Sequence, residues 1–89
     1  MPVFKGHEKG LEAFIADHLK QVGVTGFVYV EFVVDTDGSV RDIRILRGLN
    51  EAAGREAMRV IRMTDGQWKP GTQNEKPVPV KLTVAVAFK

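Results

Sequence analysis

The chain has 89 residues, of which 44% are hydrophobic and 27% charged, and its formal net charge is +2 at pH 7. These proportions are typical of a folded domain, so they disfavour disorder and membrane insertion. The chain has no cysteine, which excludes a disulfide framework and thiol chemistry but allows an oxidising compartment. No apolar run approaches the roughly 20 residues that cross a bilayer, so we expect any membrane anchor to lie outside these residues.

We expect one domain over residues 1–89, which begins with a short extended segment and a helix. Pro2 disfavours a helix in the first five residues, and Phe4 is a candidate anchor onto the core. Between Glu8 and Lys20, apolar residues recur at helical spacing and predict an amphipathic helix packed on a sheet. These residues are Leu11, Phe14, Ile15 and Leu19. Residues 21–26 contain two glycines and are expected to form the connection that follows.

Residues 27–47 predict a β-hairpin. Two runs rich in β-branched and aromatic residues flank Asp35–Ser39, which suits a type I turn closed by Gly38 at positive φ. The even residues of the first run are expected to face the core. In the return run, Ile43 and Ile45 continue that face, and Val40 joins them only if the strand carries a bulge near Arg41 and Asp42. We expect that bulge.

A second helix is predicted after Asn50, a residue suited to the N-cap. Its buried stripe consists of Ala53, Ala57, Val60 and Ile61, and Asp65 and Gly66 should end it. We expect its acids, Glu51 and Glu56, to be solvated. Residues 67–76 are predicted to form a polar loop in which Trp68 closes the end of the core, because a lone tryptophan in a small domain usually serves packing.

Residues 77–89 show regular alternation of apolar and polar or small residues, which predicts a long, half-buried strand. The chain order is thus helix, strand, strand, helix, strand. Strands with one apolar and one mixed face favour an antiparallel sheet. We therefore predict an α+β fold with a three-stranded antiparallel sheet, in the spatial order second, first, third, and with both helices on one face.

In this arrangement the last strand lies at an edge. Pro77 and Pro79 lack a backbone N–H, so the side toward which they point is expected to be unpaired. Lys81, Thr83 and the odd residues after them would then direct their backbone groups outward. Such an edge accepts an extended peptide by strand addition, or is simply an edge, or is covered by residues 1–5.

Catalytic and metal-binding patterns do not appear in the sequence. Asp35 and Asp37 resemble the start of a calcium loop, but the glycine falls at its fourth place rather than its sixth. The histidines, His7 and His18, are far apart and without cysteine partners. There is no nucleophile motif and no phosphate-binding loop. We expect no enzyme, no cofactor and no metal.

Several segments together resemble the C-terminal domain of TonB energy transducers. They are the opening Pro2–Gly6, the run GFVYVEFVVDTDGSVRDIRILRG of residues 26–48, EAMRVIR of 56–62, WKPG of 68–71 and KPVPVKLTVAVAF of 76–88. The resemblance runs nearly end to end, and the order and spacing of the pieces are more specific than any single piece.

The resemblance implies a periplasmic domain of a protein anchored in the inner membrane and coupled there to the ExbB–ExbD proton-driven motor. It also implies that the domain captures the TonB box, a short segment of outer-membrane transporters, as a strand added beside its last strand. The partner-binding residues would be those of that strand: Val78, Pro79, Val80, Lys81, Leu82, Thr83, Val84, Ala85 and Ala87.

Two alternatives compete with this interpretation. Compared with the family, the chain passes directly from Leu19–Val22 to Gly23, and short hinge loops favour exchange of strands between two copies. A structural module that forms a homodimer through the same edge is therefore the second hypothesis. The third is a nucleic-acid binder that uses basic residues and Tyr29 on the outer sheet face, but too few aromatic side chains lie there, and we expect no nucleic acid. The basic residues are Arg41, Arg44 and Lys81.

Overall fold

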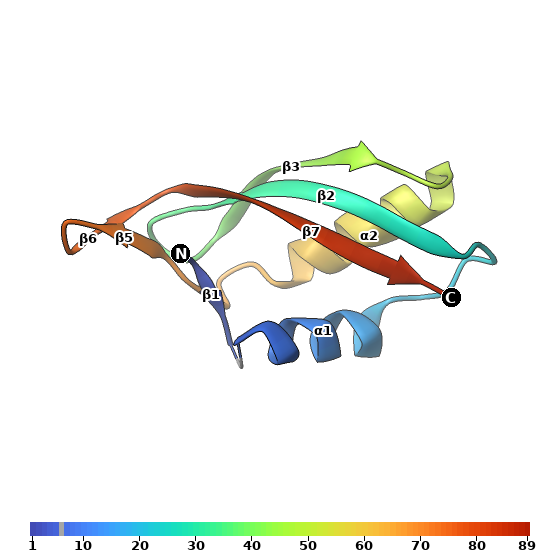
Figure 1. Cartoon of the computed structure of the whole chain (residues 1–89), viewed down its shortest axis with the longest axis horizontal. Coiled ribbons are helices and arrows are strands. Elements are labelled where there is room, and N and C mark those ends of the chain that lie inside the picture. Colours follow the sequence, from blue (N-terminus) through green and yellow to red (C-terminus); the bar gives the residue numbers. More distant parts are fainter. Residues whose placement is uncertain (6) are drawn as a thin grey trace.

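The computed structural model describes residues 1–5 and 7–89, with side chains for 1–5 and 9–89, so Gly6 of the TonB-like opening and the side chain of His7 lie outside the described residues. The fold is α+β, and its main sheet is antiparallel with the order β3-β2-β7 (Figure 1). The predicted fold and strand order are confirmed. The elements are β1 (Val3–Phe4), α1 (His7–His18), β2 (Gly26–Val34), β3 (Val40–Arg47), α2 (Glu51–Met63), β4 (Trp68–Lys69), β5 (Gly71–Gln73), β6 (Lys76–Val78) and β7 (Val80–Phe88).

The central hairpin is built from β2 and β3. The N–H of Asp35 donates to the carbonyl of Ser39 at 2.8 Å, and the N–H of Gly38 donates to the carbonyl of Asp35 at 3.0 Å. Gly38 has φ +85°, the left-handed conformation that glycine adopts without a Cβ clash. The turn is therefore the predicted one, and it fixes the register of the two strands.

The predicted bulge in β3 is confirmed. Glu31 pairs with Arg44 and Val33 pairs with Arg41, so two residues of β3 oppose one of β2, and Asp42 has φ +53°. A second register shift, which the sequence did not suggest, lies opposite the step from Tyr29 to Val30 and leaves Leu46 as the extra residue. The two bulges place the apolar residues of β3 on the helix side: Val40, Ile43 and Ile45.

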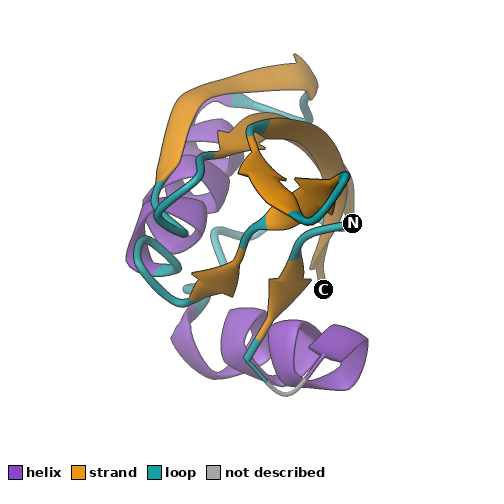
Figure 2. Cartoon of the chain, turned by 90° about the vertical axis from the view of Figure 1, so that its left-hand side faces the viewer, coloured by secondary structure: helices purple, strands orange, loops and turns teal. Residues whose placement is uncertain are grey.

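The core lies between the sheet and the two helices, and Figure 2 shows the twisted sheet curving over them. The even residues of β2 from Val28 to Val34 and the predicted stripe of α2 are fully buried, because both patterns present one apolar face. Asn50 caps α2 by accepting the N–H of Ala53 at 2.8 Å. The apolar side chains that α1, β2, α2 and β7 contribute to this buried cluster are Ile15, Val28, Val30, Phe32, Val34, Ala53, Ala57, Val60, Ile61, Val86 and Phe88.

Trp68 closes one end of this core, as predicted. It is 7% exposed, its ring packs edge-on against Phe4 with centroids 5.3 Å apart, and its indole N–H donates to Thr64 Oγ1 at 2.9 Å. β1 pairs antiparallel with β4, which holds the N-terminal segment beside the tryptophan. The lead-in segment therefore contains a strand of two residues, Val3–Phe4.

The predicted loop over residues 67–76 is wrong in part, because this range contains β4, β5 and the first residue of β6, and β5 and β6 form a small hairpin. Its two turn residues, Asn74 and Glu75, both have positive φ, at 51° and 67°. The predicted single strand over 77–89 is also interrupted at Pro79, which separates β6 from β7. Pro77 lies one pair beyond the tight turn, where its missing N–H is not needed for pairing with β5.

Candidate functional site: the edge of the last strand

β7 is an edge strand among the described residues, and it is unusually regular. It pairs with β2 over nine consecutive residues, from Val34 with Val80 to Gly26 with Phe88, without a register shift. Exposed strand edges are templates for one more strand, because they carry backbone donors and acceptors. The edge thus offers an interaction surface made of backbone rather than of reactive side chains.

The direction of these backbone groups follows from the hairpin turn. The N–H of Asp35 points toward β3, where it donates to Ser39. Since alternate residues of a strand point their groups to the same side, the odd residues of β2 face β3 and the even residues face β7. Even residues of β2 pair with even residues of β7. The odd residues of β7 therefore direct their N–H and C=O groups away from the sheet: Lys81, Thr83, Ala85 and Ala87.

The opposite edge, on β3, is less suited to strand addition. It carries two bulges, and bulges interrupt the spacing of backbone donors and acceptors. Its Asp42 lies in the left-handed region. Of the two edges of the main sheet, only β7 presents an unbroken ladder in the part of the chain that the structure describes.

The predicted partner-binding residues fall into two groups around this edge. Val78 belongs to β6 and pairs with Gly71, and Pro79 lies between β6 and β7. All the others lie in β7 itself. The exposed side chains, on the outer face, are Lys81, Thr83, Ala85 and Ala87, whereas Val80, Leu82 and Val84 are partly buried, and of these Leu82 and Val84 pack against the core.

Two hollows lie beside β7. The first, of about 460 Å³, is lined by Leu82, Thr83 and Val84 together with Leu11, Trp68 and residues 1–4. The second, of about 410 Å³, lies between the other half of β7 and α1 and is lined by Ile15, Ala16, Leu19, Ala85 and Ala87, with Glu12, Gln21, Phe27 and Lys89 around them. In Figures 1 and 2, α1 runs below β7, on the side where a further strand would lie.

The outer face of the sheet is open, but most of its cations are held by acids. Glu31 accepts from Arg44 Nε at 2.8 Å and lies 3.8 Å from the ammonium of Lys81. Arg41 contacts both Asp35 and Asp42, and its hydrogen bond holds the pKa of Asp35 below the ordinary value. A surface that binds nucleic acid needs cationic side chains free to contact phosphates, so these ion pairs argue against the hypothesis of a nucleic-acid binder.

An interaction that the sequence did not suggest joins the end of α1 to α2. Glu56, which was expected to be solvated, is 9% exposed. It accepts from Arg59 Nε at 2.8 Å and from the backbone N–H of Lys20 at 2.7 Å, while Arg59 donates to the carbonyl of His18 at 2.7 Å. The Arg59 guanidinium holds the pKa of Glu56 below its ordinary value. From α2, Glu56 and Arg59 thus bind backbone groups at and just after the C-terminal end of α1, and they hold in place the helix that lines the second hollow.

Side chains that could bind a metal ion do not gather in the described part of the chain. No three histidine or acidic side chains there lie close enough to hold a metal ion. His18 contacts the carbonyl of Phe14 at 2.9 Å and stacks on its ring. Neither of the two described helices is long and apolar enough to span a membrane.

The fold and the free edge together define a small α+β domain with a sheet edge open to a partner. The chain belongs to the family of Gram-negative bacterial TonB protein C-terminal domains, whose family model matches residues 17–89. This is a non-enzymatic, transport-associated family of the periplasm. The NMR solution structure of the Helicobacter pylori TonB C-terminal domain has the same fold, with a TM-score of 0.62 and 21% identity over 86% of this chain and 88% of that one. No curated protein matches in sequence.

Proposed function

We propose that this domain binds the TonB-box peptide of outer-membrane transporters by strand addition at β7. In this role it is a periplasmic adaptor that passes inner-membrane proton-motive energy to active uptake. Its coupling to ExbB–ExbD, through a membrane anchor outside these residues, belongs to the same proposal. The observation that carries the proposal is the unbroken edge of β7, whose four outward-facing residues offer backbone bonds to an extended segment.

The surroundings of the edge support the same role. The outward-facing side chains after Lys81 are small, so they leave the backbone accessible to another strand. The two hollows provide space for side chains of an added strand on the helix side. Pro77, Pro79 and Lys81 sit at one end of the edge and limit unspecific pairing there. Affinity would come from backbone hydrogen bonds and specificity from the hollows.

A peptide titration followed by NMR tests the proposal. A synthetic TonB-box peptide is expected to shift the backbone amides of Lys81, Thr83 and Ala85, which point toward the added strand. The amides of Leu82 and Val84 bond to β2 and should shift less. Shifts confined to the loop at residues 74–75, or to the β3 edge, would remove the proposal.

A homodimer formed through the same edge is the second candidate. It is favoured by the regularity of β7, since a strand edge with small side chains can pair antiparallel with its own copy about a two-fold axis. Sedimentation equilibrium separates the two candidates. A mass that stays monomeric up to millimolar concentration excludes stable self-pairing, whereas a concentration-dependent dimer that the peptide dissociates would show that both use β7.

A further inference from the structure

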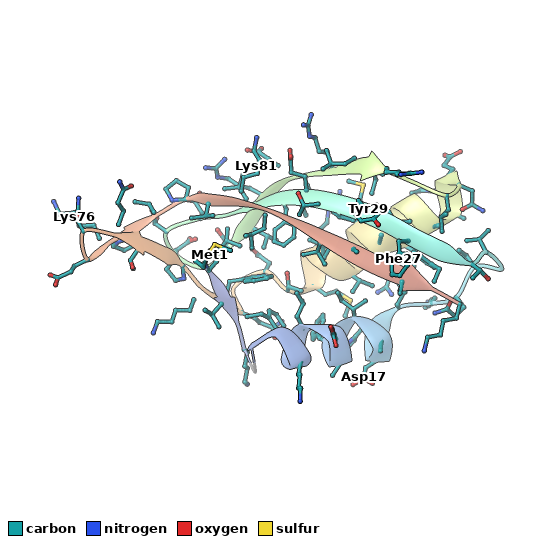
Figure 3. All side chains as sticks on the ribbon, viewed as in Figure 1. Met1, Asp17, Phe27, Tyr29, Lys76 and Lys81 are labelled. Atoms are coloured by element: carbon teal, nitrogen blue, oxygen red, sulfur yellow. The ribbon has the colours of Figure 1, made fainter. Side chains whose placement is uncertain are left out.

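The second hollow beside β7 determines which side chain an added strand can carry. Its inner wall is formed by Ile15 and Ala16 of α1 and by Leu19 directly after this helix, and its other wall is the edge at Ala85 and Ala87. Phe27 of β2 also lines the hollow, from the outer face of the sheet, and it pairs with Ala87 of β7. In Figure 3, Phe27 lies near the C-terminal end of β7, while Asp17 of α1 points away from the sheet.

A strand placed against the outward groups of Ala85 and Ala87 would lie between these two walls. Side chains of a strand alternate between faces, so one residue would face Phe27 and the next would face α1. The hollow measures about 410 Å³, which exceeds the volume of a leucine or phenylalanine side chain. On the helix side it is lined by the apolar Ile15, Ala16 and Leu19 and by the polar Glu12 and Gln21.

The occupant is an extended peptide rather than a helix or a small molecule. The backbone donors and acceptors of β7 repeat at strand spacing, and only an extended chain can meet them in succession. Charge limits the peptide further: on the outer face of the sheet, Glu31 is shared between Arg44 of β3 and Lys81 of β7, so these three side chains carry one net positive charge. That charge favours a peptide without net positive charge.

We infer that α1 determines which peptides bind at the β7 edge. The added strand carries a bulky aliphatic side chain in the hollow between α1 and β7, and Ala16 sets the size of the side chain that this hollow accepts. The inference rests on the proposed strand addition at β7. Ala16 is exposed and lines the hollow, whereas Ala13 is exposed on the same helix and does not line it. The two alanines therefore provide a matched pair for substitution.

The test uses a capped peptide that alternates threonine and valine and ends in two glutamates for solubility. One helix-facing position, placed opposite Ala85–Ala87 by NMR, is varied between alanine and leucine, and affinities are measured by fluorescence anisotropy. The wild-type domain is expected to bind the leucine peptide about tenfold more tightly than the alanine peptide, because the larger side chain is removed from water.

The substitution Ala16→Leu should abolish this preference by filling the hollow, leaving the alanine peptide bound within about twofold of wild type. The control Ala13→Leu should keep the tenfold preference. A thermal melt verifies that both variants fold. If both peptides bind at β7 with equal affinity to all three proteins, the inference is wrong and strand addition stands. If neither peptide binds the wild-type domain, the inference is wrong, and the TonB-box titration described above decides the proposed function separately.

Discussion

The substitution Thr83→Pro separates the role of β7 in binding from its role in the fold. Thr83 is exposed and pairs with Glu31 at a position where its N–H points away from β2. Proline would remove that N–H and place its ring where an added strand must lie. A net backbone hydrogen bond contributes about 1 kcal/mol, and the peptide carbonyl left without a partner costs about another 1–3 kcal/mol. We therefore expect the affinity for a TonB-box peptide to fall at least about thirtyfold.

The stability of Thr83→Pro should change little, because no bond to β2 is lost. We expect a decrease of about 1 kcal/mol or less, which is roughly 4–8 °C in Tm for a domain of this size. The control is Val84→Pro, which removes a bond to Val30 within the sheet and should cost about 3 kcal/mol or more. Thr83→Ala keeps the N–H and should bind peptide within about twofold of wild type. Equal melting of the two proline variants would contradict this assignment of the two sides of β7, and a lower melting temperature for Thr83→Pro would mean that they are reversed.

Two further predictions concern contacts that hold the site in place. Glu56→Gln should lower the free energy of unfolding at pH 7 by about 1–3 kcal/mol, whereas Glu51→Gln, in an exposed pair, should change it by less than about 0.5 kcal/mol. The pKa of Glu56 is lowered in the folded state, so this carboxylate stabilises the fold at pH values above the ordinary carboxyl pKa, and the stabilisation is lost as pH falls through the folded pKa. Denaturant melts should therefore show that the difference in unfolding free energy between wild type and Glu56→Gln shrinks below about pH 4. An advantage that persisted undiminished at pH 2 would contradict the ion-pair explanation. Gly38→Ala should cost more than about 3 kcal/mol, because its Cβ would overlap the carbonyl oxygen of Trp68, whereas Gly66→Ala, with similar φ but open space, should cost about 1–2 kcal/mol. Similar melts for the two alanine variants would show that the close approach at Gly38 is not tight.

The sequence predicted the parts of the fold that depend on local pattern. The hairpin follows from its turn residues and alternation, and Asn50 signals the start of α2 by its own chemistry. The bulge at Asp42 could be predicted because Val40 and Ile43 can share the buried face only if an extra residue intervenes.

Features that depend on contacts between distant segments were not predicted. The Glu56 carboxylate meets the N–H of Lys20, 36 residues away, and nothing in the helical pattern of either segment indicates that meeting. The hairpin of β5 and β6 was missed because its turn has no glycine: Asn74 commonly adopts positive φ, but Glu75 rarely does. The hollow beside Ala16 depends on the placement of α1 against β7, which is a property of packing.

The central claim is that alternate backbone groups of β7 have no partner in the free domain and gain one when an extended peptide binds. Amide hydrogen exchange measured residue by residue along β7 tests it most directly. The amides of Leu82, Val84 and Val86 are expected to exchange slowly, and those of Lys81, Thr83, Ala85 and Ala87 quickly, until a TonB-box peptide protects them. Uniform slow exchange along the strand of a monomeric domain without peptide, or no added protection in the complex, would contradict the claim.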